Sequence, residues 1–365
     1  MNKRLAYLCS SGSWGGLEMN QLRNAVWMKN RGHDVLIICS VGAPLAEAAN
    51  AEGILVEQIG KHRKYYDFRA GKKLAEILDR HSVTHLIIRD TRDMSLSVIA
   101  KRKSKHRIHL SYFMEMQLGV PKKGWLHSIR FSYLDLWSCP LNWLSEQVRK
   151  MTKMDPARIR VIPSGLDLSR FSGRINREDA RHTLDLPQDQ VIVGLSGRFD
   201  PQKGQLLLLE ATSSAQHKDF SVCFLGEPTK GEGMGYTEAI HDFIATNNLS
   251  DRVFIRPFRK DIEVFYKAID VFVMASKAET FGMVTIEALA SGTPVIASNS
   301  GGSPEILGKG RYGMLFEPLN AVSLADKIDL LLDKPPFEEK ELQQAAQLYD
   351  HHKVCEEVEI ALGLI

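Results

Sequence analysis

Short apolar runs alternate with longer, more polar segments along this chain, and the alternation occurs twice. The first half contains the runs LAYLCS, DVLIICS, THLIIR and RIHLSYFME, and the second half contains QVIVGLSGR, FSVCFLG, RVFIRPF and DVFVMAS. Runs of this kind, without polar alternation, are typical of strands that are covered by helices on both faces of a parallel sheet. The sequence therefore predicts an α/β protein made of two doubly wound domains.

The chain has 365 residues, which is too long for one ordinary core and suits two domains. We predict an N-terminal Rossmann-like domain at residues 1–163 and a second one at residues 164–345. The remaining residues, 346–365, are expected to form a C-terminal helix that packs back toward the first domain. Within these domains, residues 125–150 are predicted to be helical, and TPVIAS (residues 293–298) is predicted to close the second series of strands.

Composition points to a globular protein of a reducing compartment. Hydrophobic residues make up 44% of the chain and charged residues 25%, and no stretch of 18 apolar residues occurs. The five cysteines are scattered and show no CxxC spacing. We therefore expect a cytoplasmic protein without a zinc site or a disulfide framework, and we predict no metal site.

A glycine-rich segment, SGSWGGLE, follows the first predicted strand. Gly15 and Gly16 allow the backbone to approach a ligand closely, and the helix that follows offers amide groups to an anion. The spacing is not G-x-G-x-x-G, and no acidic residue ends the second strand, which argues against an NAD or FAD enzyme. The alternative is a tight strand-to-helix turn that requires glycine.

Two cations lie in the corresponding loop of the second domain, LSGRFDPQKGQ. Arg198 and Lys203 stand between a predicted strand and a predicted helix, where a guanidinium and an ammonium suit a diphosphate. Both would also stabilise the growing charge of a departing diphosphate. The alternative is a pair of solvated loop cations.

The segment KAETFGMVTIEALASGTPVIASNSGG places two carboxylates eight residues apart. Glu279 is expected on a loop and Glu287 about one turn inside the next helix, so the two side chains would have different roles. Backbone amides of residues 281–283 can point at an oxyanion, and residues 300–304 form a second candidate anion site. Alone, Glu287 reads as a partner of the helix dipole and Glu279 as surface charge; together with the glycine turn they indicate binding of sugar hydroxyl groups.

These motifs together resemble glycosyltransferase family 4, whose members are retaining enzymes of the GT-B fold, with two Rossmann-like domains facing across a cleft. The Glu279-(seven residues)-Glu287 pattern is similar to the family signature. GRFDPQKG is similar to its basic loop, and IPSGLDLSRF and GTPVIASNSGGSPEIL are similar to two further stretches. The resemblance covers nearly the whole chain and extends to enzymes that build the lipopolysaccharide core.

The resemblance implies a role for each matching residue. Arg198 and Lys203 would bind the donor diphosphate, which Gly15 and Gly16 would approach from the other domain. Glu279 would contact the sugar, and Glu287 the ribose. The remaining implied donor contacts are the amides of Phe281, Gly282 and Met283 and, beside the base, Phe258. The donor would be a UDP- or GDP-linked sugar, no further cofactor is implied, and relatives of this kind are typically metal-independent.

One position departs from the family pattern. Many relatives carry a histidine after the fourth or fifth strand of the first domain, where this chain reads HLSYFMEMQLGV. Glu115 is the candidate to replace that histidine, with a surface carboxylate as the alternative.

The charge distribution indicates an anionic acceptor. Residues 1–163 contain 27 Lys and Arg against 14 Asp and Glu, a net charge of +13, whereas the remainder contains 20 against 30, a net charge of −10. Basic residues lie among aromatic ones at 61–66 and 121–137. We expect a glycan or anionic glycolipid acceptor and peripheral contact with the inner face of the cell membrane, and no nucleic acid. A partly buried helix with solvated lysines is the alternative for that surface. A nucleotide-sugar epimerase and a catalytically silent binding partner are the alternatives for the whole chain.

Overall fold

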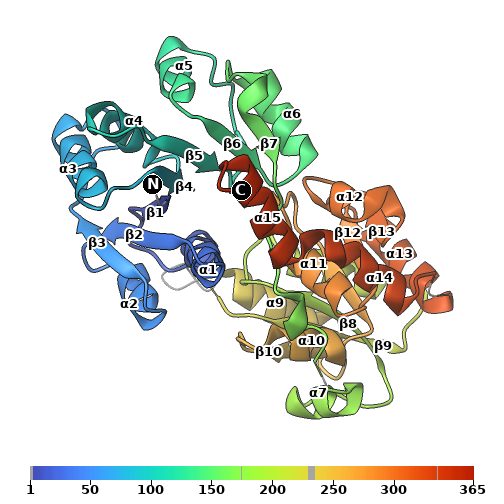
Figure 1. Ribbon diagram of the computed structural model, residues 1–365. Helices are drawn as coiled ribbons and strands as arrows, with labels where there is room; N and C mark the ends of the chain where they lie inside the picture. The colour runs from blue at the N-terminus through green and yellow to red at the C-terminus, as the bar shows by residue number, and fades with distance from the viewer. Residues whose placement is uncertain (1–2, 174, 229–234, 335) are drawn as a thin grey trace. The chain divides into compact units, whose positions relative to one another are not determined.

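The computed structural model describes residues 3–173, 175–228, 235–334 and 336–365 (Figure 1). The chain divides into two compact units. Unit 1 comprises Met1–Gly165 together with His351–Ile365, and unit 2 comprises Leu166–Asp350. Each unit contains one parallel sheet with helices on its faces, which is the α/β architecture that the alternating pattern predicts.

Unit 1 contains a seven-stranded parallel sheet in the order β3-β2-β1-β4-β5-β6-β7. Its strands are β1 (Arg4–Cys9), β2 (Asp34–Ser40), β3 (Leu55–Ile59), β4 (His85–Ile88), β5 (His109–Phe113), β6 (Leu136–Cys139) and β7 (Ile159–Val161). Its helices are α1 (Gly16–Asn30), α2 (Pro44–Ala51), α3 (Phe68–Arg80), α4 (Met94–Lys103), α5 (Trp125–Ser132), α6 (Asn142–Met151) and α15 (His351–Ala361).

Alternate residues of β1 show why this sheet is buried on both faces. Ala6 and Leu8 belong to one hydrophobic cluster, and Leu5 and Tyr7 belong to another. The second cluster also takes in Val354 and Val358 of α15. A strand that contributes to two cores must be apolar throughout, and this accounts for the run LAYLCS.

The C-terminal helix α15 is joined to α1 by polar contacts as well as by packing. The carboxylate of Glu359 accepts hydrogen bonds from the Arg31 guanidinium, at 2.5 and 2.9 Å, and lies 2.7 Å from Nε2 of His33. Glu359 is only 4% exposed, and its pKa is held below the usual value chiefly by the bond from Arg31. The last residues of the chain therefore complete the core of unit 1.

Unit 2 contains a six-stranded parallel sheet in the order β10-β9-β8-β11-β12-β13. Its strands are β8 (Val191–Ser196), β9 (Phe220–Leu225), β10 (Val253–Arg256), β11 (Val271–Met274), β12 (Val295–Ser298) and β13 (Met314–Phe316). Its helices are α7 (Arg177–Thr183), α8 (Gln205–Ser214), α9 (Gly235–Thr246), α10 (Ile262–Ala268), α11 (Met283–Ala290), α12 (Ser303–Ile306), α13 (Ala321–Asp333) and α14 (Glu339–Ala346). Short 3₁₀ turns occur at Pro156–Arg158, Leu168–Arg170, Gly308–Gly310 and Gln347–Tyr349.

The structure corrects two secondary-structure predictions. Residues 125–150 do not form one helix, because β6 lies between α5 and α6 and pairs with β5 and β7. TPVIAS does not close the second sheet, because β13 pairs with β12 beyond it. Both missed strands are only three or four residues long. A short buried run has no periodicity that separates a strand from a helix.

Across the described ranges, no helix combines the length and the apolar composition that crossing a membrane requires.

Candidate functional site

The order of strands in unit 2 reverses between β8 and β11. From β8 the chain moves to β9 and β10 on one side, and it then returns to β11 on the other. Loops that leave the carboxyl ends of two such neighbouring strands diverge, and the crevice between them is where doubly wound sheets bind ligands. Arg198 and Lys203 lie in the loop after β8, and Glu279 lies in the loop after β11.

The structure brings Lys203 and Glu279 together. Nζ of Lys203 donates a hydrogen bond to Oε2 of Glu279 at 2.9 Å, and the two side chains are 31% and 23% exposed. The backbone also joins the loops, because the amide of Lys277 donates to the carbonyl of Gln202 at 3.1 Å. An ammonium has three donors, so Lys203 can orient Glu279 and still donate to an anion.

Glycines allow these loops to approach one another closely. Gly204 has φ +80°, and a Cβ there would lie 2.5 Å from the carbonyl oxygen of Ala275. Gly301, after β12, has φ +58°, and a Cβ there would lie 2.1 Å from the carbonyl oxygen of Glu279. That same carbonyl accepts a hydrogen bond from the amide of Gly302 at 2.8 Å. The Gly301–Gly302 segment thus packs directly on the Glu279 carbonyl, and any larger residue at 301 would displace it.

Helix α11 begins at this crevice. Gly282 is its N-cap, with φ +99°, and the helix then runs from Met283. Within the described residues, the amides of Phe281, Gly282 and Met283 donate to no protein acceptor. This is expected, because the first amides of a helix have no acceptor within the helix. These amides can therefore bind an oxyanion beside Lys203.

Glu287, on the second turn of α11, is held by a residue that the sequence did not single out. The hydroxyl of Tyr266, on α10, donates to Oε2 of Glu287 at 3.0 Å. Tyr266 is 1% exposed, and burial, followed by the charge of Glu287, raises its pKa well above the usual range. A phenol that stays protonated is a permanent donor, so it fixes the carboxylate. The partners of Glu287 and Glu279 differ, as separate roles require.

The loop after β10 presents Phe258, whose side chain is 64% exposed. Its basic neighbours are engaged elsewhere. Arg256 donates to the carbonyl of Leu184 at 2.5 Å, and Arg259 pairs with Asp261 at 2.6 Å. Phe258 therefore presents an exposed aromatic ring, whereas Arg256 stabilises the protein itself. Stacking of Phe258 on the base stays a prediction.

In unit 1 the strand order reverses between β1 and β4, and the loop after β1 carries Gly15 and Gly16. Gly15 is the N-cap of α1, and its amide donates to Oε2 of Glu18 at 2.9 Å. A Cβ at Gly16 would meet no atom within 4 Å. Packing within unit 1 therefore does not require glycine at position 16. Binding of the donor by Gly15 and Gly16 stays a prediction.

A buried carboxylate that the sequence did not reveal also lies at this reversal point. Asp93 is fully buried and accepts hydrogen bonds from the amide of Ser10, at 3.1 Å, and from its hydroxyl. Nε2 of His62 lies 3.2 Å from Asp93, and the His62 side chain is 4% exposed. The bond to Asp93 raises the pKa of His62 above its usual value of 6.5.

This pair predicts a pH-dependent contribution to stability. Because the folded pKa of His62 is raised, protonated His62 stabilises unit 1 fully below pH 6.5, and the contribution is lost as pH rises through the folded pKa. We expect the difference in thermal midpoint between the wild type and His62→Gln to be largest at acidic pH and to shrink as pH rises through the raised pKa of folded His62. Thermal scans of the full chain at several pH values measure it, and a difference that does not vary with pH would contradict the prediction.

Glu115, the candidate to replace the family histidine, is engaged by two side chains. Its Oε1 pairs with Nη1 of Arg89, and its Oε2 accepts from Nδ2 of Asn20 at 3.2 Å. The Glu115 and Arg89 side chains are 16% and 6% exposed. With both oxygens bound by neighbouring side chains, Glu115 is part of a structural ion pair and is not a solvated surface carboxylate. A catalytic role for Glu115 stays a prediction.

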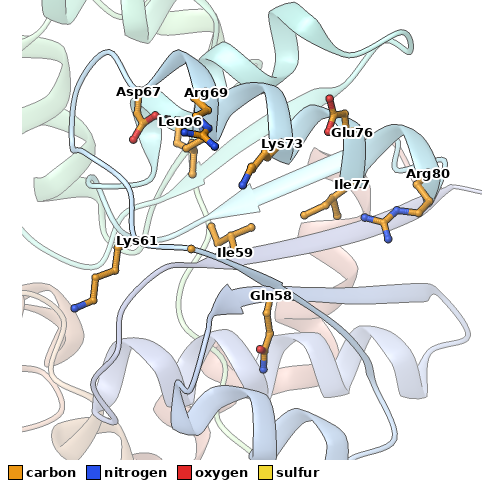
Figure 2. Close-up of a pocket in the computed structure, with 12 residues that line it drawn as sticks. Gln58, Ile59, Lys61, Asp67, Arg69, Lys73, Glu76, Ile77, Arg80 and Leu96 are labelled. Carbon is orange, nitrogen blue, oxygen red and sulfur yellow. Dashed lines mark hydrogen bonds between the residues drawn. The ribbon is translucent and has the colours of Figure 1, made fainter.

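A groove of about 530 Å³ lies in unit 1 between β3 and α3 (Figure 2). Its apolar residues include Ile59, Ile77 and Leu96, and Lys73 extends from α3 toward β3. Lys61 and Arg69 lie toward one end, and neither they nor Lys73 forms an ion pair within the described residues. The groove has the volume of a small-molecule site and an excess of positive charge, but it contains none of the predicted site residues.

No group of three His, Cys, Asp or Glu side chains in the described part of the chain is arranged to hold a metal ion. Lys203 and the amides at the start of α11 supply positive charge at the unit 2 crevice, and Arg198 lies in the same loop as Lys203.

Two family models match successive parts of the chain. The model described as Glycosyltransferase Family 4 matches residues 14–170, and the model described as Glycosyl transferases group 1 matches residues 176–348. The D-inositol 3-phosphate glycosyltransferase of Mycolicibacterium smegmatis is 33% identical over 214 residues, which are 58% of this chain and 48% of that protein. The chain thus spans about half the length of the curated relatives it matches.

Solved structures share the fold along the whole chain. A glycosyltransferase from Rickettsia africae has a TM-score of 0.88 at 23% identity and covers 99% of this chain and 98% of its own. HepE from Anabaena, solved in complex with UDP and glucose, has a TM-score of 0.82 at 20% identity and covers 100% of both chains. At these identities the likeness concerns the fold.

Proposed function

This chain belongs to glycosyltransferase family 4 and has the GT-B fold, and from that premise we propose that it is a retaining transferase for a hexose-type sugar. The donor is a nucleotide-diphosphate sugar, UDP- or GDP-linked, and the acceptor is a glycan or an anionic glycolipid. The observation that carries the proposal is the Lys203–Glu279 pair beside the free amides of α11, at the crevice where the strand order reverses.

Each group of the crevice has a role in this proposal. Lys203, Arg198 and the α11 amides bind the diphosphate and stabilise the charge that it gains as it leaves. Glu279, oriented by Lys203, accepts hydrogen bonds from the sugar hydroxyls. Glu287, oriented by Tyr266, accepts them from the ribose hydroxyls, and Phe258 stacks on the base.

In the proposed reaction, the bond between the anomeric carbon and the diphosphate oxygen breaks while the acceptor hydroxyl bonds to the same face of that carbon. The hydroxyl proton passes to the departing phosphate oxygen, so that the configuration is retained and no protein base is needed. Two cations and a helix N-terminus already supply positive charge there, which supports a metal-independent reaction.

The acceptor side of the proposal rests on charge. Four cations and two carboxylates line the groove beside α3, and three of the cations (Lys61, Arg69 and Lys73) form no ion pair among the described residues. The first 163 residues carry a net charge of +13. An acceptor that bears phosphate or carboxylate groups suits this surface, as do cell-surface polysaccharide and lipopolysaccharide precursors at the inner face of the membrane. A cytoplasmic enzyme in peripheral contact with that membrane follows from this proposal.

Two other functions remain to be separated from transfer. A nucleotide-sugar epimerase would convert the donor without consuming an acceptor, and a silent binding partner would bind the nucleotide without turnover. The paired Lys203 and Glu279 favour an active site over a silent one, because both groups are present and positioned.

A thermal-shift comparison of UDP, GDP, ADP and CDP, with EDTA and then with Mg²⁺, tests the donor site. A nucleotide at a hundred times its dissociation constant should stabilise the protein by about 2.7 kcal/mol. We expect one diphosphate to act equally well with and without metal. Glu287→Ala should abolish most of that shift, and Glu341→Ala, an exposed glutamate of α14, should leave it unchanged. A response to none of the four, or a response that requires Mg²⁺, would contradict the proposed donor site.

A further inference from the structure

A second hollow in unit 1 gathers basic side chains without an acidic one. It has a volume of about 30 Å³, and its lining includes Lys64, Lys122, His127 and Arg130 together with Tyr65 and Trp137. None of its lining residues is Asp or Glu. We call these four basic residues and Trp137 the basic pocket. A volume of about 10–15 Å³ holds one water molecule, so the basic pocket has room for about two or three water-sized groups.

The cations of the basic pocket face one another without counter-charges. In the described part of the chain, Lys64, Lys122 and Arg130 form no ion pair. Arg130 lies 4.8 Å from the ring centre of Tyr65, and Lys64 lies 5.6 Å from it. Burial, followed by the charge of Lys64, lowers the pKa of Lys122. Cations in this arrangement repel one another, and a bound anion would remove the repulsion.

His127 adds a donor to the basic pocket. Nη2 of Arg130 lies 2.5 Å from Nδ1 of His127. A guanidinium can only donate, so Nδ1 must accept, and neutral His127 carries its proton on Nε2. Burial, followed by the charges of Arg130, Lys122 and Lys64, lowers the pKa of His127 and favours this neutral form.

Trp137 lacks a partner that it should have. Its side chain is 1% exposed, and its Nε1 group has no hydrogen-bond acceptor among the described residues. Buried indole donors nearly always find an acceptor. Because Trp137 is one of the residues that line the basic pocket, an anion bound there is a candidate for this acceptor.

Separate elements hold the basic pocket in shape. The amide of Lys122 donates to the carbonyl of Met151 at 2.7 Å, and Arg130 donates to the hydroxyl of Ser95 at 3.2 Å. Trp137, on β6, packs edge-on against Phe131 of α5. The Arg130 guanidinium and the backbone of Lys122 are therefore held in place before any ligand arrives, which reduces the entropy lost on binding.

We propose that the basic pocket binds a phosphate group of the acceptor. This inference rests on the proposed function, because it assigns a place to the anionic group of the substrate. A phosphate has enough acceptor oxygens to meet two ammonium groups, a guanidinium and the indole N–H at once. The phosphate could belong to a soluble phosphorylated acceptor or to a lipid headgroup. Trp125, Leu126 and Ile129 of α5 are 71%, 40% and 50% exposed, so a membrane surface could supply the second source.

Spectroscopy on the full chain tests the basic pocket with inorganic phosphate as the soluble probe. At constant ionic strength, phosphate should shift the indole N–H resonance of Trp137 with saturation and should raise the pKa of His127. Lys122→Gln should weaken this binding about tenfold or more, because a charged hydrogen bond is lost. Lys123→Gln removes the same charge one residue away, on an exposed side chain that does not line the basic pocket, and should change binding less than twofold.

Vesicles distinguish the two sources of phosphate. Flotation with phosphatidylglycerol vesicles should depend on Lys122 and not on Lys123 if the group is a lipid headgroup, and phosphatidylcholine vesicles should bind weakly. Saturable binding of free phosphate without a specific vesicle effect would identify a soluble phosphorylated acceptor. Equal effects of Lys122→Gln and Lys123→Gln in both experiments would overturn the proposal, because they would reflect net charge alone.

The nucleotide thermal shift separates failure of this inference from failure of the proposed function. Lys122→Gln should keep the full nucleotide response, because Lys122 lies in unit 1 and the donor crevice lies in unit 2. A normal nucleotide response without phosphate binding would refute the phosphate site in the basic pocket and would not contradict the proposed transferase function. Lys122-dependent phosphate binding without any nucleotide response would keep the anion site and overturn the proposed donor.

Discussion

Replacing Lys203 with Ala is expected to lower turnover of the nucleotide sugar by about 10²–10³-fold, the usual effect of removing a preorganised group that stabilises a leaving anion. Affinity for the nucleoside diphosphate should fall by about tenfold or more, as loss of a charged hydrogen bond predicts. Donor consumption and calorimetric titration with the diphosphate measure the two effects.

The fold should survive this change. The Lys203–Glu279 pair is 31% and 23% exposed, and partly exposed ion pairs contribute only about 0–1 kcal/mol to stability. The matched control is Lys340→Ala on α14, which removes an exposed lysine with no ion pair in the described residues. Wild-type turnover in Lys203→Ala would refute the assignment of the diphosphate to this crevice.

Replacing Gly301 with Ala is expected to inactivate the enzyme without touching a proposed ligand-binding side chain. The new Cβ would lie 2.1 Å from the carbonyl oxygen of Glu279, so the Glu279 loop must move. Misplacement of a catalytic group by about 1 Å can lower a rate by about 10²-fold. We expect a loss of turnover of this order, measured as donor consumption.

Gly310→Ala provides the control for backbone strain. Gly310 has φ +101°, so alanine is strained there too, but a Cβ would meet no atom within 4 Å. A non-glycine residue in the left-handed region costs about 1–2 kcal/mol, so both variants should melt at lower temperatures than the wild type. Only Gly301→Ala should lose turnover. Equal losses in the two variants would attribute the effect to strain, and the proposed role of the Glu279 loop would fall.

The sequence predicted the parallel α/β architecture because its evidence is local. A strand that is buried on both faces must be apolar at every position, and this is legible in LAYLCS and DVFVMAS. The prediction was wrong over residues 125–150 because β6 is only four residues long, and a fully buried LWSC carries no period. This segment is a strand because β6 pairs with β5 and β7, which is a tertiary interaction.

The candidate site divides in the same way. The helix that follows Gly282 was predicted from the sequence, because a helical segment after a glycine is a local feature, whereas the left-handed conformation of Gly282 was seen only in the structure. Tyr266 could not be found, since nothing in IEVFYKA distinguishes a tyrosine that orients Glu287 from one that only fills the core. The buried Asp93 was missed for the same reason, because its partners come from the residue that follows β1 and from the loop after β3.

By itself, the sequence determined the fold class, the order of the loops and the residue types that chemistry requires in them. Only the tertiary structure decided which of those residues meet. Lys203 and Glu279 are 76 positions apart and touch because β8 and β11 are neighbours at the reversal of the sheet. Lys64, Lys122 and Arg130 line one hollow although they belong to different segments. Lys64 lies in the loop after β3, Lys122 forms a β-bridge with Thr152, and Arg130 is part of α5. The free energy of strand pairing comes from contacts between residues that are far apart in the sequence, so no short segment of the sequence reveals which strands pair.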